Sequence, residues 1–600
     1  MAILTLLLGY GFGIVNHRMT LPLIWFYQDP TLFSRDVIPA VAPHFSIYFY
    51  KAIAWLVPSE LLIEQIFFIG WFISAGLSCW LMAKMSVDLN ENETVPFYTA
   101  LIFALGYEVC QAGATLHDRY FGHVCLSIPF ILSSIYLLMK KRYEWSVVLT
   151  GLLFYIHGMY AVQLSFCLMA VLLLDFKQVG RRRFFGNIIF LGGLSCPALI
   201  DKFLSMDFGP SMSLNHWLML LRMHYPIHFF PSSWSKYDWN SLVTFLCFLF
   251  WTLIVDRQSK KKTEIPKILY AIFCAVLVMY LLGIIFTELF PVQVIIELQL
   301  LRSSLFLFVV GFPFIVRYLV HKLKSNDLEE NIIAAATLGI FFSTNHIFVG
   351  AFFLFNIFQD LMEMKIIPKI NYAMTIVVTV SLSLIILLPL LKILADISIL
   401  PPIFYYLSAK VNPPTLLRII IIPIPVIVFI LIKFLRTNLD QSRLLRHHLL
   451  NTIIVLLIVF GVYRAISGGW YQKQDPEWKD VQIWCSRYTS TKSLIVTPPE
   501  LQGFRIYSRR SILGEWTDSW WYHSRTDAQE WWKRMQAYGY VNQIPVGDVR
   551  SSTGDDLLNA AKLYQADFIV TTQKIILPLP CLYRNKGFNV YSFSSHLTGI

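Results

Sequence analysis

Runs of about 20 apolar residues recur along most of residues 1–466, and this repeat constrains the fold more than any other feature. Hydrocarbon offers a backbone amide no water, so an open chain can cross it repeatedly only as helices, whose hydrogen bonds are internal. The sequence is 56% hydrophobic and 14% charged, which excludes a soluble protein with a single core. We therefore predict a polytopic α-helical membrane protein with roughly 13–15 spans.

Short basic connectors between the apolar runs predict the orientation, because Lys and Arg are enriched in cytoplasmic loops. If all connectors face the cytoplasm, the number of spans between two neighbouring connectors must be even. Residues 145–176 lie between two connectors, so this run should be a hairpin of two short helices that turns near His157. The rule places the N-terminus inside and the C-terminus outside a plasma (inner) membrane. The connectors are residues 140–142, 177–183, 257–262, 321–324 and 433–446.

The same rule, applied along the whole chain, divides it into spans and outward segments. The outward segments are residues 17–60, 114–121, 201–238, 287–303 and 392–414. Within the first, the amphipathic stretch 44–57 suits a helix that lies in the membrane interface. The expected spans are residues 2–16, 61–84, 97–113, 122–139, 146–157, 159–175, 186–200, 239–255, 268–286, 304–320, 331–345, 347–362, 371–391, 415–434 and 449–466.

The net charge of +12 does not indicate nucleic-acid binding, because Lys and Arg are concentrated in the connectors and not on one folded face. We expect membrane lipids around the spans and no nucleic-acid partner. Seven of the nine cysteines lie in or beside apolar runs, without metal-ligand spacing, and should pack as small apolar residues. The remaining two, Cys485 and Cys581, leave a disulfide between them open.

From Gly468 the composition changes to that of a soluble protein. We divide the chain into a transmembrane module, residues 1–466, and a small extracytoplasmic α/β domain, residues 467–600. Helices alternate with strands in the second part, and no phosphate-binding glycine loop accompanies them. The aromatic run 516–522 favours packing in a core over stacking on sugar rings. The expected helices are 476–488, 527–538 and 555–565, and the expected strands are 493–497, 567–572 and 589–593.

The first outward segment carries two candidate catalytic carboxylates, Asp29 and Asp36, which follow His17. A carboxylate held at the membrane face beside basic groups can act as a general base toward a hydroxyl. It can also hold a metal that neutralises a phosphate leaving group. The simpler alternative is a solvated turn, because Asp-Pro commonly initiates turns.

The other outward segments add histidines and arginines on the same side of the membrane. The turn around Asp118 packs several ionisable groups between apolar spans, which requires pairing, water or a function, and an interface anchor is the alternative. Arginine binds phosphate through two N–H groups, so the segment 215–228 favours a phosphate cradle over zinc, because Pro226 interrupts the His224–His228 spacing. Arg302 begins a span at this face, with snorkelling as its alternative. The candidate substrate-binding residues are His17, His117, Arg119, Arg222, His224, His228 and Arg302.

Several short motifs accompany this layout. They are Asn16-His17 before the loop from Asp29-Pro30 to Asp36, Tyr155-Ile156-His157-Gly158, Arg222 to His228, Leu298-Gln299 with Arg302-Ser303, and Pro498-Pro499 followed by Gly503-Phe504-Arg505 and Ser508-Arg509-Arg510. Together with the acidic first outward loop and the outer soluble domain, they resemble the GT-C superfamily of polyprenyl-phosphate-sugar-dependent glycosyltransferases. Within it, the chain looks like a group of bacterial polytopic proteins of uncharacterised activity.

The resemblance implies a GT-C-like fold, a lipid-linked sugar donor and an inverting sugar transfer to a glycan, lipid or protein acceptor. Asp29 or Asp36 would deprotonate the acceptor, and Arg119, Arg222 and Arg302 would hold the lipid phosphate. Replacing both aspartates by Asn should then abolish transfer. The first loop has no adjacent Asp-Glu or Asp-x-Asp pair, which leaves the base and any divalent metal open.

A transporter of polysaccharide or lipid, or a non-catalytic envelope-assembly protein, is the competing class. Transporters place ionisable groups near the bilayer midplane, often with an internal repeat. In this sequence no clear repeat is found, and the ionisable groups gather at the outer face, which favours surface chemistry.

Overall fold

The computed structural model of the chain describes most of its first half and the C-terminal part. The expected spans 371–391, 415–434 and 449–466 lie outside the described residues, and those at 331–345 and 347–362 are described only at isolated positions. The described residues are 9–45, 47–57, 60–88, 94–105, 111–116, 118–205, 212–258, 265–323, 471–472, 474–541 and 551–593, with isolated positions between 330 and 364.

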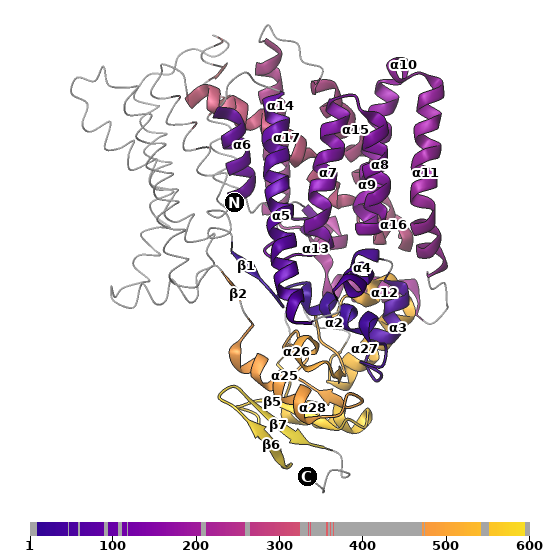
Figure 1. Cartoon of the computed structure of the whole chain (residues 1–600), viewed down its shortest axis with the longest axis vertical. Coiled ribbons are helices and arrows are strands. Elements are labelled where there is room, and N and C mark those ends of the chain that lie inside the picture. The colour runs from indigo at the N-terminus through magenta and orange to yellow at the C-terminus, as the bar shows by residue number, and fades with distance from the viewer. Residues whose placement is uncertain are drawn as a thin grey trace, which may run out of the picture.

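Long apolar helices stand side by side in the upper part of the molecule (Figure 1). Among the described residues, five helical segments are long and apolar enough to cross a membrane: Leu62–Val87, Arg181–Leu204, Asp238–Val255, Lys267–Leu289 and Gln293–Leu323. Shorter apolar helices pack among them. The bounds are α5 Glu60–Val87, α6 Thr94–Leu105, α7 His123–Met139, α8 Tyr143–Ile156, α9 Gly158–Leu174, α10 Phe176–Val179, α11 Arg181–Leu204, α14 Lys236–Gln258, α15 Ile265–Ile284 and α17 Ser304–Leu323.

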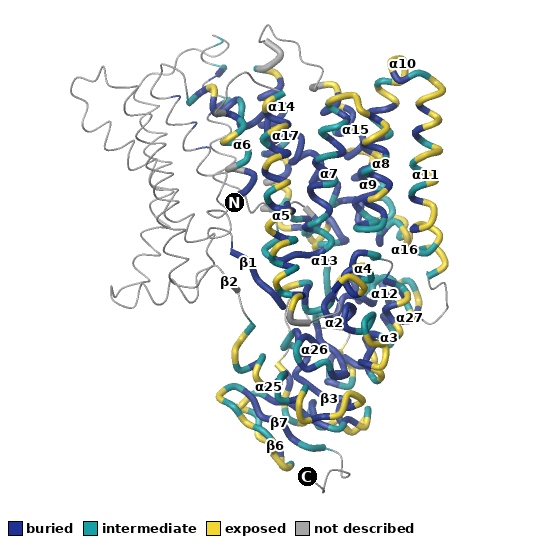
Figure 2. The backbone as a smooth tube through the Cα atoms, in the orientation of Figure 1, coloured by how far each residue is buried: buried dark blue, intermediate teal, exposed yellow. Residues whose placement is uncertain are grey.

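The predicted hairpin over residues 145–176 is confirmed. Helices α8 and α9 meet at His157, and α8 packs against α7, α9 and α11. The helices differ in how much of their surface is buried. A helix that is apolar on all sides lies either in the centre of the protein or against lipid. In the segment Gln293–Leu323, which includes α17, 94% of the most apolar 18 residues are buried. The corresponding share in α11 is 22%, and α11 exposes residues such as Ile189 and Phe203 (Figure 2).

A layer of short helices lies between the long helices and the C-terminal domain. Helix α4 occupies most of the stretch expected at the interface, and it exposes Trp55. The layer contains α2 His17–Gln28, α3 Ile38–Val41, η1 Ala42–His44, α4 Tyr48–Leu56, η2 Gln111–Gly113, α12 Leu214–His224, α13 Pro226–Phe229, η3 Pro231–Ser233, η4 Ile285–Leu289, α16 Gln293–Glu297 and η5 Leu300–Ser303.

The first expected span, 2–16, is wrong over its described part. Strand β1 (Tyr10–Gly11) pairs in parallel with β2 (Tyr471–Gln472), and the helix starts only at His17. Gly9 and Gly13 have φ values of 77° and 73°, which end helical geometry on both sides of the strand. Within the expected span 97–113, α6 is described as far as Leu105 and residues 106–110 lie outside the described residues. At its end, Ala112 has a left-handed φ of 58° in the short segment η2, so the described residues 111–113 do not continue an α-helix.

The C-terminal part is a small α/β domain, as predicted. Its five strands have the order β4-β3-β5-β7-β6, with β4, β3 and β5 parallel and β7 antiparallel to both β5 and β6. Every expected helix and strand is present within a few residues, and the two short strands β4 and β6 were missed. The bounds are α25 Pro476–Tyr488, β3 Leu494–Val496, α26 Arg505–Ser508, β4 Ser511–Ile512, η6 Trp520–His523, α27 Arg525–Ala537, α28 Gly554–Leu563, β5 Phe568–Thr572, β6 Cys581–Arg584 and β7 Phe588–Ser592.

Side chains of the domain and of the interfacial layer share one core. Trp521 and Trp531 stack at 4.8 Å between ring centroids, and Trp217 of α12 belongs to the same buried cluster. Packing therefore accounts for the tryptophans of the aromatic run. Cys485 is buried and Cys581 is exposed, and both thiols are free, so they form no disulfide.

The described basic connectors lie at the opposite end of the long helices from the α/β domain (Figure 1). Residues 140–142 join α7 to α8, and α10 with the start of α11 carries the next group. Residues at the other end of these helices face the interfacial layer. Basic groups and the soluble domain are thus separated by the thickness of the bundle.

Candidate functional site

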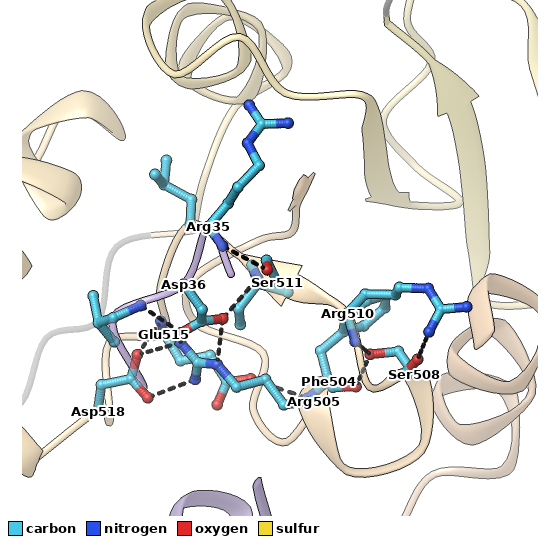
Figure 3. Close-up of polar contacts among 12 residues, drawn as sticks. Arg35, Asp36, Phe504, Arg505, Ser508, Arg510, Ser511, Glu515 and Asp518 are labelled. Atoms are coloured by element: carbon cyan, nitrogen blue, oxygen red, sulfur yellow. Dashed lines mark hydrogen bonds and ion pairs between the residues drawn. The ribbon is translucent and has the colours of Figure 1, made fainter. Parts of the chain in front are cut away.

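A buried charge cluster joins the first outward segment to the C-terminal domain (Figure 3). The guanidinium of Arg505 donates to Asp36 from Nε (2.9 Å) and Nη2 (3.0 Å). It also donates to Asp518 from Nη1 (2.8 Å) and Nη2 (3.0 Å). Two parallel pairs of charge-assisted bonds fix the guanidinium plane. The loop around Asp36 is therefore held to the domain.

Glu515 adds a third carboxylate to this cluster. It accepts hydrogen bonds from the backbone N–H groups of Gly503 (2.9 Å) and Phe504 (3.0 Å). Burial raises the pKa of Glu515 to about 7, against the opposing charge of Arg505. Burial of Arg505 acts to lower the pKa of its guanidinium. The neighbouring carboxylates of Asp36 and Asp518 have a larger effect in the opposite direction, so the pKa of Arg505 lies above the ordinary value.

Asp36 is placed where it cannot easily act as a base. Besides the two bonds from Arg505, its oxygens accept from the backbone N–H groups of Ile512 (2.8 Å) and Val37 (2.7 Å). A carboxylate offers about four acceptor positions, and all are used here. The side chain has no exposed surface. The geometry favours a structural role for Asp36.

Asp29 forms the solvated turn that was its alternative interpretation. Its Oδ1 accepts from the backbone N–H (3.0 Å) and the hydroxyl (2.7 Å) of Thr31, and the residue is exposed. These two bonds lower its pKa. Burial acts in the opposite direction but is outweighed, so the pKa stays below the ordinary value.

Arg302 lies at the start of α17, inside the interfacial layer. Its Nε donates to the carbonyl of Ala112 (3.0 Å), and its Nη2 lies 3.0 Å from Nδ1 of His228. The His228 ring lies against Gly113, and only a glycine fits there, because a Cβ atom at this position would lie 2.2 Å from Cε1 of His228. Burial and the charge of Arg302 lower the pKa of His228 to about 4, so the imidazole is neutral at pH 7.

A strained turn presents Arg302 at this position. Gln299 has a left-handed φ of 45°, and its carbonyl accepts from Nε2 of Gln163 in α9 (3.0 Å). The same amide donates to the carbonyl of Leu298 (3.0 Å). Gln163 is fully buried, so these two bonds anchor the turn to the bundle. Arg302 is thereby positioned by a residue that the sequence did not single out.

Asp118 lies near Arg302 in the turn before α7. Its Oδ1 accepts from the hydroxyl of Thr115 (2.8 Å). Its Oδ2 is sealed from solvent. Burial raises the pKa of Asp118 to about 6, while Thr115, Tyr120 and the charge of Arg302 act in the opposite direction. Asp118 stands out in the sequence by its ionisable neighbours, but it is not among the predicted site residues.

His17 uses both ring nitrogens to hold the backbone. Nδ1 accepts from the N–H of Gly13 (3.1 Å), so Nε2 carries the proton and donates to the carbonyl of Phe121 (2.6 Å). Burial lowers the pKa of His17 to about 4, although the bond to Phe121 opposes this. These contacts indicate a structural histidine that ties β1 to the turn before α7.

Three further polar side chains join the layer. Tyr50 of α4 is hydrogen-bonded to Nδ1 of His123 (2.7 Å), whose ring lies 4.8 Å from that of His157. Nδ1 of His157 accepts from the N–H of Tyr160 (3.3 Å), and its sealed Nε2 has no described partner. The motif around His157 was noted, but Tyr50 and His123 were missed because only tertiary packing brings them together.

The remaining candidates do not converge on Arg302. Arg222 pairs with Glu288 (2.9 Å) at the surface, and its guanidinium covers Phe230. His224 bonds the carbonyl of Trp516 and packs among tryptophan rings, which makes it a docking residue. The carbonyl of Arg119 accepts from Gly11, and His117 lies outside the described residues. No group of three potential metal ligands occurs in the described part of the chain.

These features define a helical membrane protein with a small α/β domain docked on one end of its bundle. Residues 476–538 match the family described as a domain of unknown function (DUF6798). The matched segment runs from α25 to the end of α27 and contributes Arg505, Glu515 and Asp518 to the buried charge cluster. No curated protein matches the chain.

Proposed function

We propose that this chain is a GT-C-like membrane glycosyltransferase that moves a sugar from a polyprenyl-phosphate donor to an envelope or extracellular glycan, lipid or protein. The proposal rests first on the motifs that resemble that superfamily. It places the reaction at the outer face of a plasma membrane, with the α/β domain extracytoplasmic. The separation of basic connectors from that domain supports this orientation, because basic loops favour the cytoplasm.

The observation that carries the proposal is the setting of Arg302. It forms no ion pair within the described residues, and its partners are a carbonyl and a neutral imidazole. A guanidinium at a membrane boundary is costly unless it is wetted or bound by an anion. Arginine is suited to phosphate because its fork of N–H groups matches the phosphate oxygens. A lipid phosphate could reach it from the outer leaflet.

Transport is the second candidate, and one observation favours it. At the other end of α17, Nζ of buried Lys322 lies 2.5 Å from Oδ1 of Asp360 and 3.6 Å from Glu330. Asp360 also accepts from the Trp251 indole (2.6 Å) and the Tyr318 hydroxyl (2.6 Å). Buried ion networks of this kind mark ion pathways in many transporters.

Transfer assays with purified protein in lipid nanodiscs separate the two functions. The donors are radiolabelled polyprenyl-phosphate hexoses and pentoses, with and without divalent metal, and a membrane extract supplies acceptors. Label that moves from carrier to acceptor supports the transferase and identifies its donor. No turnover with any donor, together with protein-dependent uptake of labelled solute into vesicles, would replace it by a transporter.

A further inference from the structure

We infer that a basic patch at the end of the bundle away from the α/β domain binds an anionic phospholipid headgroup. This inference goes beyond the proposed function and does not depend on it. The patch is formed by two of the connectors that predict the orientation, and all its residues are exposed. We define the basic patch as Lys141, Arg142, Lys177, Arg181, Arg182 and Arg183.

Tertiary contacts join the two connectors into one surface. Nζ of Lys141, which lies between α7 and α8, donates to Oε1 of Gln178 in α10 (3.0 Å). The hydroxyl of Tyr143, at the start of α8, donates to Asp175 just before α10 (2.8 Å). These bonds bring the cations of both connectors together at the end of the bundle where α10 lies (Figure 1).

The positive charge of the basic patch is only partly compensated. The acidic residues next to the two connectors in the sequence are Glu144 and Asp175, and the second is bound by Tyr143. Lys140 of the first connector is paired with Asp88 (2.7 Å), so it is left out of the patch. An excess of cations therefore remains at this surface.

Three consecutive arginines form the first turn of α11 without a counter-ion among the described residues. Neither Arg181 nor Arg182 nor Arg183 forms an ion pair there, and the turn contains no acidic residue. The partial positive charge at the start of a helix adds to the repulsion among these side chains. A phosphate diester offsets this repulsion, because guanidinium N–H groups match phosphate oxygens.

Exposed apolar side chains beside the basic patch indicate that the phosphate belongs to a lipid. The guanidinium carbon of Arg181 lies 6.0 Å from the centroid of the Phe185 ring, and Ile189 continues the exposed face of α11. Trp145 of α8 and Phe176 of α10 are exposed at the same end. Aromatic side chains at this level are typical of the membrane–water boundary, and the apolar face suits acyl chains. Soluble phosphate or nucleic acid would leave that face without a partner.

The preference of basic loops for the cytoplasm does not by itself require this geometry. It depends on how many Lys and Arg residues a loop contains, and not on contacts between loops. Joined connectors, guanidinium groups without a described counter-ion and an adjacent apolar helix face are features of a lipid headgroup site between helices. The excess of positive charge favours anionic over zwitterionic headgroups.

The test compares the full-length wild-type protein with the triple variant Arg181→Gln, Arg182→Gln, Arg183→Gln in phosphatidylcholine nanodiscs. Spin-labelled phosphatidylglycerol is added below one molecule per protein, and electron paramagnetic resonance measures the fraction immobilised on the protein. Each Lys or Arg near an anionic membrane surface strengthens binding about fivefold, so the triple variant should bind about tenfold more weakly or less. A change below about threefold overturns the inference, as does equal binding of spin-labelled phosphatidylcholine by the wild-type protein.

A matched control removes the same charge from the α/β domain. Lys492→Gln, Lys533→Gln and Lys562→Gln replace three exposed cations that lie far from the basic patch, at the other end of the molecule. This control variant should bind phosphatidylglycerol as the wild-type protein does. An equal loss in both triple variants would show that net charge alone sets the affinity, and it would overturn the site.

Two further measurements keep the inference testable if the arginine variant does not fold. Arg142→Gln and Lys177→Gln lie on different connectors, and each should weaken phosphatidylglycerol binding about fivefold. Unchanged binding in both variants would overturn the inference. Excess inorganic phosphate should displace the labelled lipid no better than sodium chloride at equal ionic strength. Stronger displacement by phosphate would replace the lipid by a soluble phosphate ligand.

Discussion

Asp29 and Asp36 share one loop but differ in what surrounds them. Asp36→Asn removes a charge that compensates buried Arg505, and breaking a buried pair costs about 3–5 kcal/mol. Asp29 is exposed, where substitutions usually change stability by less than about 0.5 kcal/mol. We expect D36N to lower the melting temperature in nanodiscs clearly and D29N to leave it unchanged. Equal melting temperatures for both variants would show that the Asp36–Arg505 ion pair does not stabilise the folded protein.

His17 predicts a pH dependence of stability. Its pKa is about 4 in the folded protein, below the ordinary 6.5, so between these values the unfolded chain binds more protons. Stability therefore increases with pH through this window and is lost as the pH falls from 6.5 toward 4. His17→Gln, which keeps an acceptor and a donor, should flatten the dependence of melting temperature on pH in that window. His224 and His228 contribute in the same direction, whereas the raised pKa values of Glu515 and Asp118 contribute in the opposite direction. The effect of His17 is therefore the difference between the wild-type and H17Q pH profiles.

At the scale of elements, η2 must approach α13 closely. Gly113 and Gly180 have similar left-handed φ values of 69° and 77°, but only Gly113 faces a close neighbour, the His228 ring. Gly180→Ala should cost about 1–2 kcal/mol from backbone strain alone. Gly113→Ala should cost more and should weaken donor binding, because it displaces His228 and Arg302. Thermal unfolding and donor binding measure the difference, and equal effects of the two variants would contradict the packing argument.

The elements themselves could largely be predicted from the sequence. Apolar runs and basic connectors located α7, α8, α9 and α17, because span length and charge placement are local properties. Helical and strand patterns in the sequence likewise located α25 and β5 in the domain. The N-terminal strand was missed because apolar residues 2–16 suit a span, while its pairing partner lies at Tyr471–Gln472.

The sites could be predicted only in part. Arg302 and His228 were singled out from their residue types, but their contact depends on Gly113 and on the anchoring of Gln299 by Gln163. The role of Asp36 could not be foreseen, because its partner Arg505 lies in another domain. Long-range pairing decides which ionisable groups are satisfied, and a sequence pattern shows only local spacing.

At the scale of the whole molecule, several contacts hold the α/β domain to the interfacial layer. Among them are the β1–β2 pair, the Asp36–Arg505 and Arg35–Asp567 ion pairs, and the docking of His224 among tryptophans. The domain and the interfacial layer are thus parts of one assembly. The α/β domain therefore covers the face of the interfacial layer that points away from the bundle.

This arrangement predicts that the domain and the basic connectors lie on opposite sides of the membrane. Exposed Cys581 is a native label site on the domain, and Arg142 lies in an exposed basic connector. In right-side-out vesicles, a membrane-impermeant maleimide should label Cys581, and Cys581→Ser should remove that signal. A cysteine introduced by Arg142→Cys in the C581S background should react only after permeabilisation, because the bilayer separates it from the reagent. Labelling of the Arg142 position in sealed vesicles would reverse the orientation and would place the proposed transfer on the cytoplasmic side.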